Sequence, residues 1–157
     1  MQLFQMRSAV ILGLTVTLGG MSACGEDPVQ SQDISRAELV GRFEATTIHV
    51  DPDGSEAPID VLEELGGEME VTLNADGTTT GHILVPGAGE GGGDLDESLT
   101  GTFTFEEDTG ELTFEQGADT FVRDLTFQSV RSGGTIELRA DETLATGDAF
   151  EVVLRRQ

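Results

Sequence analysis

Residues 68–85 read EMEVTLNADGTTTGHILV, and this stretch decides the fold. Met69, Val71 and Leu73 alternate with polar residues, which is the pattern of a β-strand with one buried face. Residues 74–77 (NADG) form a turn signal, in which the glycine supplies the positive φ that a tight hairpin needs. The return strand is predicted at residues 78–85. The sequence therefore predicts an antiparallel hairpin within an all-β domain.

Six further segments share this period-two pattern and predict strands, at residues 39–50, 99–106, 111–115, 121–130, 135–139 and 149–156. In the first of them Phe43 and Ala45 share one face, whereas Ile48 and Val50 lie on the other, so a β-bulge is expected between them. Short loops join most of the strands. We predict an eight-stranded up-and-down antiparallel barrel, because closure removes the exposed sheet edges. The alternative is a two-sheet β-sandwich.

Two short helical segments are predicted beside the strands. Ser35 and Glu38 have the spacing of a capping box, which begins a helical turn. Apolar residues at 59, 61, 62 and 65, followed by two glycines, predict one or two turns of helix between the first two strands. The glycine-rich stretch at 86–94 (PGAGEGGGD) is expected to be a loop.

The first 23 residues have the organisation of a secretory signal, with Arg7 before an apolar run that is too short to span a membrane. Residues 21–24 (MSAC) resemble the lipobox of bacterial lipoproteins, which implies that Cys24 becomes the lipidated first residue. We predict a signal peptide at 1–23, a polar flexible linker at 24–37 and a barrel domain at 38–157. The protein is then exported and anchored to a membrane by its lipid. Gly25 after Cys24 favours the outer membrane in a cell that has two.

The charge of the chain limits its partners. The formal net charge is −22, and it becomes −23 after residue 23 because Arg7 is the only charged residue before that point. Such a field repels nucleic acids and anionic headgroups, so no nucleic-acid partner is expected. The oligomeric state is left open by the sequence.

A resemblance to lipocalins and other calycins follows from the order of several short motifs. Residues 39–43 (LVGRF) resemble the Gly-x-Trp opening of that family, with Gly41 in place and Phe43 instead of tryptophan. Residues 71–78 (VTLNADGT), 101–104 (GTFT) and 152–156 (VVLRR) are also similar to small lipocalin-like bacterial lipoproteins. The resemblance implies a barrel closed at its base by Gly41, Phe43 and an arginine of the last strand, Arg155 or its neighbour Arg156, with Arg155 preferred.

Candidate ligand contacts lie on the predicted inward rows. Phe103, Phe105, Phe114 and Phe127 would line the interior of the barrel. Arg123 shares the inward row of its segment by strict alternation, where it could meet a ligand carboxylate, as in some calycins. Pairing of Arg123 with Asp119, Asp124 or solvent is the interpretation we favour, because a buried charge needs a partner.

No catalytic, metal or cofactor site is predicted. Residues 87–92 match G-x-G-x-x-G but are followed by acids instead of the helix N-terminus that would hold a phosphate. The acidic stretches at 51–56 and 94–97 lack the full spacing of a calcium loop. His49 and His82 are expected on outer strand faces. The sequence offers no nucleophile motif, so we predict that the protein is not an enzyme.

Two functions are consistent with these features. In the first, a lipid-anchored envelope protein binds a small hydrophobic molecule inside a lipocalin-like barrel. In the second, the barrel is filled by its own side chains and the protein has a structural or interaction role in the envelope.

Overall fold

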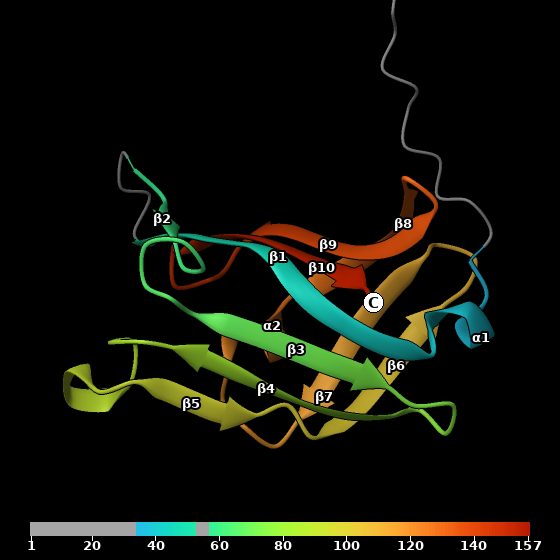
Figure 1. Cartoon of the computed structure of the whole chain (residues 1–157), viewed down its shortest axis with the longest axis horizontal. Helices are drawn as coiled ribbons and strands as arrows, with labels where there is room; N and C mark the ends of the chain where they lie inside the picture. The colour runs from blue at the N-terminus through green and yellow to red at the C-terminus, as the bar shows by residue number, and fades with distance from the viewer. Residues whose placement is uncertain (1–33, 53–56) are drawn as a thin grey trace, which may run out of the picture.

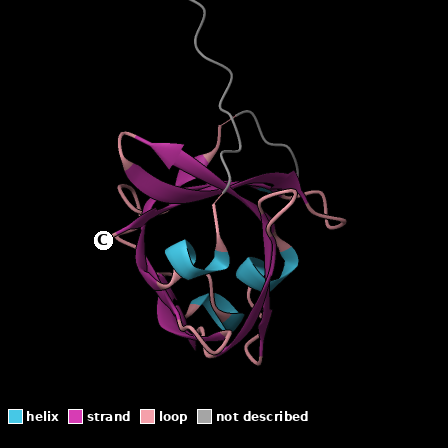
Figure 2. Ribbon diagram, turned by 90° about the vertical axis from the view of Figure 1, so that its right-hand side faces the viewer, coloured by secondary structure: helices cyan, strands magenta, loops and turns pink. Residues whose placement is uncertain are grey.

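The computed structural model describes residues 34–52 and 57–157, and it shows a closed antiparallel β-barrel (Figures 1 and 2). The eight barrel strands are β1 (Gly41–Asp51), β3 (Glu68–Leu73), β4 (Thr78–Val85), β6 (Gly101–Glu106), β7 (Glu111–Gln116), β8 (Thr126–Ser132), β9 (Thr135–Thr143) and β10 (Ala149–Arg156). Each strand pairs with the next along the chain, and β10 pairs with β1 to close the barrel. The predicted up-and-down barrel is confirmed, and closure excludes the two-sheet sandwich.

Two short strands extend the sheet beyond the barrel. Strand β2 (Ile59–Asp60) pairs with the end of β1, and β5 (Leu95–Ser98) pairs with the end of β4. Strands β5 and β6 pair with β4 in the same register. Strands β5 and β6 are therefore successive parts of one bent strand. A 3-10 turn, η2 (Glu90–Gly92), lies in the glycine-rich loop that was predicted before β5.

The hairpin of β3 and β4 has the predicted turn. Gly77 has a φ of 88°, and its N–H donates to the carbonyl of Asn74. The Asp76 carboxylate accepts hydrogen bonds from the backbone N–H of Thr78 at 2.9 Å and from its hydroxyl at 2.6 Å. The backbone conformation and the side-chain bonds of this turn are thus encoded by adjacent residues.

Helix α1 (Arg36–Leu39) precedes the barrel and confirms the predicted capping box. The backbone N–H and the hydroxyl of Ser35 both donate to the carboxylate of Glu38. These bonds, with the nearby guanidinium of Arg131 on β8, lower the pKa of Glu38 to about 2. The ion pair with Arg131 holds α1 against one end of the barrel.

The segment at 59–65 is less helical than the sequence indicates. After β2 it forms turns, with a single helical hydrogen bond from the Glu64 N–H to the Asp60 carbonyl. The Asp60 side chain accepts from the backbone N–H groups of Leu62 and Glu63, and the Val61 N–H pairs with β1. Asp60 therefore caps a single turn, and this turn ends at Gly66, where φ is 71°.

The segment at 121–130 was predicted wrongly over its first residues. Residues Phe121–Asp124 form helix α2, and strand β8 begins only at Thr126. Phe121 stacks on Phe150 with ring centroids 4.8 Å apart, and Val122 is fully buried. A helical turn lets both of these neighbouring residues pack against the core, whereas a strand would send them to opposite faces.

The core occupies the inside of the barrel. It contains inward side chains from all eight strands, together with Leu39 of α1, Val122 of α2 and Leu99 between β5 and β6. Gly81 and Gly101 allow strands to bend closely around this core. A Cβ on either glycine would lie 2.2 or 2.1 Å from a carbonyl oxygen of the adjacent strand.

Candidate functional site

All four phenylalanines that are predicted to line a ligand cavity are buried in the core of the barrel. Phe103 and Phe114 are direct cross-strand partners, and Phe114 meets Phe127 edge to face with ring centroids 5.4 Å apart. Phe105 is also buried, and the exposed fractions of all four lie between 0% and 8%. Four surface cavities of 120–690 Å³ lie along the described residues. None of the four phenylalanines lines any of these cavities.

Arg123 lies outside the barrel interior. It belongs to α2, is exposed, and forms ion pairs with Asp119 at 2.5 Å and with Asp124 at 3.3 Å. The inward placement that strict alternation gave is therefore wrong, because the residue is in a helix. The two carboxylates raise the pKa of Arg123. Its pairing with Asp119 and Asp124 agrees with the interpretation that we favoured from the sequence.

The base of the barrel contains the expected glycine and aromatic residue, but a different arginine. Phe43 is fully buried and is the register partner of Arg156, so the two side chains share the inner face. The Arg156 guanidinium donates to the Val40 carbonyl at 2.8 Å, and its Nε would lie 3.0 Å from a Cβ on Gly41. Arg156 is thus the arginine at the base, and the preference for Arg155 was wrong because adjacent strand residues face opposite sides.

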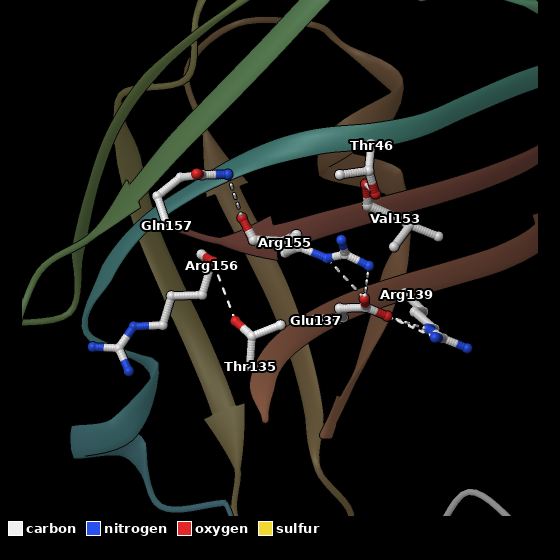
Figure 3. Close-up of polar contacts among 8 residues, drawn as sticks. All are labelled: Thr46, Thr135, Glu137, Arg139, Val153, Arg155, Arg156 and Gln157. Carbon is white, nitrogen blue, oxygen red and sulfur yellow. Dashed lines mark hydrogen bonds and ion pairs between the residues drawn. The ribbon is translucent and has the colours of Figure 1, made fainter. Parts of the chain in front are cut away.

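Arg155 instead belongs to an outer-face cluster that no sequence motif predicts (Figure 3). The carboxylate of Glu137 on β9 accepts two hydrogen bonds from Arg155 at 2.7 and 3.1 Å, and two from Arg139 at 2.6 and 3.0 Å. We call Glu137, Arg139 and Arg155 the Glu137 clamp. The Glu137 side chain is only 2% exposed, although it lies on the outer face.

The clamp keeps its carboxylate charged. Burial raises the pKa of Glu137, but the hydrogen bonds and charges of the two arginines outweigh burial and leave the pKa below its ordinary value of 4.5. The Glu137–Arg139 spacing is visible in the sequence, since residues two apart share a strand face. The register that brings Arg155 opposite Glu137 is not visible there.

One surface cavity forms a groove between β1 and β3, which we call the β1–β3 groove. Its volume is about 690 Å³. Its floor contains Ala45, Leu62 and Met69, and its rim carries charged side chains, which are Arg42, Glu44, Glu68, Glu70 and His82. No sequence pattern predicts this groove, although the bulge expected in β1 is the local feature that opens it.

The groove exists because β1 pairs with β3 along only part of its length. The two strands pair only from Gly41 to Glu44, and the register of β1 on β10 shifts between Ala45 and Thr47 at the predicted bulge. Strand β1 then pairs with β2, and the turns after β2 return the chain to β3 at Glu68. A gap in strand pairing remains, and side chains of both strands and of the turns line it.

The two histidines lie on the outer face, as expected, and each pairs with carboxylates. His49 Nδ1 is 2.9 Å from Glu151, and this hydrogen bond is the main cause that raises the pKa of His49. His82 Nε2 is 2.6 Å from Asp96 on β5. Over residues 34–52 and 57–157, no group of three or more histidine, cysteine or acidic side chains has the arrangement of a metal site.

Several predictions fall on residues outside the described ranges. These are the signal peptide, Cys24 with its lipid, most of the linker, and four residues of the acidic stretch at 51–56. Within the described part, no helix is long and apolar enough to cross a membrane.

Comparison of the sequence with protein-family models and with curated proteins found no match. The closed eight-stranded barrel is itself consistent with a lipocalin-like fold.

Proposed function

We propose that this protein is an exported, lipid-anchored envelope protein whose barrel is a scaffold filled by its own side chains and acts through its outer surface. The packing of Phe114 on Phe127 inside the barrel is the observation that carries this proposal. The buried rings occupy space that a ligand would need, so binding inside the barrel would require the core to rearrange, and close-packed cores resist such rearrangement. The anchor rests on the signal-like segment and the position of Cys24.

The alternative is a carrier that binds a small hydrophobic molecule within the barrel, and it is favoured by the lipocalin-like topology. Native mass spectrometry of the protein purified from its envelope distinguishes the two. A filled barrel gives the mass of the lipidated chain alone, and it does not increase the fluorescence of a hydrophobic dye. A retained small molecule that is lost in a Phe114→Trp variant would overturn the filled-barrel proposal.

The anchor has its own test. Mass spectrometry of the mature N-terminus is expected to show a diacylated or triacylated Cys24 as the first residue. A Cys24→Ser variant should remain unprocessed or leave the membrane fraction. Cleavage at another site, or an unmodified Cys24, would contradict the proposed anchor while leaving the filled barrel untouched.

A further inference from the structure

We propose that the β1–β3 groove binds a small amphipathic organic cation, with a protonated amine at the carboxylate rim and a short aliphatic body on the floor. This inference rests on the proposal that the protein acts through its outer surface, and it gives that surface a ligand class. The shape, floor and charge of the groove favour this class of ligand.

The shape of the groove is built into the backbone. The bulge of β1 holds the two strands apart, and Gly67 lets the returning chain lie close to Val61 and to Leu84 of β4. A Cβ on Gly67 would come within 2.6 Å of Val61 Cγ1 and 3.0 Å of the Leu84 carbonyl oxygen. The groove is thus preformed, and its volume of about 690 Å³ is in the range of small-molecule sites.

The floor offers an aliphatic surface. Met69 is 4% exposed and belongs to the core, while Ala45 and Leu62 are half-buried and pack against that core. No aromatic ring lines the groove. An aliphatic chain can therefore bury its methylene groups there, whereas an aromatic cage for a quaternary ammonium is not present.

The rim has more carboxylates than cations. Glu44 and Glu70 are direct cross-strand partners, a position where two like charges repel. One guanidinium, that of Arg42, lies between them, with contacts of 2.7 Å to Glu44 and 2.5 Å to Glu70. Glu68 adds a third carboxylate to the rim.

His82, the remaining rim side chain, does not offset the excess of carboxylates at the rim. His82 Nδ1 is 4.0 Å from Glu68, but its Nε2 already faces the carboxylate of Asp96 at 2.6 Å. A ligand with a positive head reduces the repulsion at the rim, and a ligand with a negative head increases it. The excess of carboxylates at the rim therefore favours a ligand with a positive head. The aliphatic floor favours a ligand with an aliphatic body.

Met69 supplies a local probe for binding. The full chain, labelled with ¹³C-methyl methionine, is titrated with hexylammonium, hexanoate and 1-hexanol, which share one tail. Met69 is the only methionine among the described residues, and its signal is assigned by its loss in a Met69→Leu variant. We expect a saturable shift with hexylammonium that weakens as salt is added, and no comparable shift with hexanoate.

A pair of variants tests the charge of the rim. The double variant Glu68→Gln/Glu70→Gln should weaken hexylammonium binding by roughly threefold to tenfold, the range expected for two exposed charge pairs. The matched control Glu106→Gln/Asp108→Asn removes the same charge at the far β6–β7 turn and should leave binding unchanged.

Three outcomes would overturn the proposal. They are no shift of Met69 at saturating amine, an equal shift with hexanol or hexanoate, and equal weakening by the rim variant and its control. A ligand found inside the barrel would refute the filled-barrel function instead, and it would leave these titrations interpretable.

Discussion

Removal of the Glu137 carboxylate tests how much the clamp contributes to stability. A Glu137→Gln substitution keeps the size of the side chain but removes the charge that accepts four guanidinium hydrogen bonds of 2.6–3.1 Å. Arg139 and Arg155 are 45% and 51% exposed, so each regains water once its partner is lost. We therefore expect a loss of about 1–2 kcal/mol in the free energy of unfolding, below the ~3–5 kcal/mol for breaking a fully buried pair.

The assay is urea unfolding followed by far-UV circular dichroism, because the chain has no tryptophan or tyrosine for fluorescence. A double-mutant cycle with Arg155→Met isolates the cross-strand pair, with an expected coupling of about 0.5–1.5 kcal/mol. Glu106→Gln, on an exposed position of β6, is the control and should change stability by less than ~0.5 kcal/mol. An unchanged midpoint for Glu137→Gln, or zero coupling in the cycle, would refute the reasoning.

The same substitution predicts a pH dependence. The pKa of Glu137 is lower in the folded state than its ordinary value of 4.5, so its contribution to stability is present above pH 4.5. That contribution is lost as the pH falls through the lowered pKa of the folded state. The difference in stability between wild type and Glu137→Gln should therefore be constant near neutrality and shrink below pH 4.5.

Three further predictions concern other parts of the barrel. Gly81→Ala should destabilise the fold by more than ~1 kcal/mol, since its Cβ would lie 2.2 Å from a backbone carbonyl oxygen. The control Gly117→Ala meets no atom within 4 Å and should be tolerated. The urea unfolding midpoints of the two variants test this difference. An NMR titration of His49 should give a pKa above 6.5, and Glu151→Gln should lower it by removing the hydrogen bond that raises it. Phe127→Ala should cost about 3–5 kcal/mol, measured by thermal or urea unfolding, because its ring is fully buried; a much smaller loss would mean an interior that is not packed.

Local sequence patterns predicted most of the strands. The alternation of Met69, Val71 and Leu73 and the turn at Gly77 depend on adjacent residues, and both are confirmed. Alternation failed at Phe121 to Asp124, where stacking of Phe121 on Phe150 and burial of Val122 favour a helical turn. That preference comes from a strand near the end of the chain, so a local window does not contain it.

The candidate sites were less predictable for the same reason. The inward row of phenylalanines was visible, but whether they line a cavity or fill it depends on how Phe114 meets Phe127 across β7 and β8. The choice between Arg155 and Arg156 depends on the register of β10 on β1, which places one residue outside and the other inside.

By itself the sequence determined the all-β class, the faces of most strands, the hairpin turns and the strong negative charge, because each follows from composition or from residues close together in the chain. The tertiary structure alone decided the burial of Glu137 on an outer face and the opening of the β1–β3 groove. Both depend on how one strand is placed against its neighbour, and a shift of one residue in register would send every side chain involved to the opposite face.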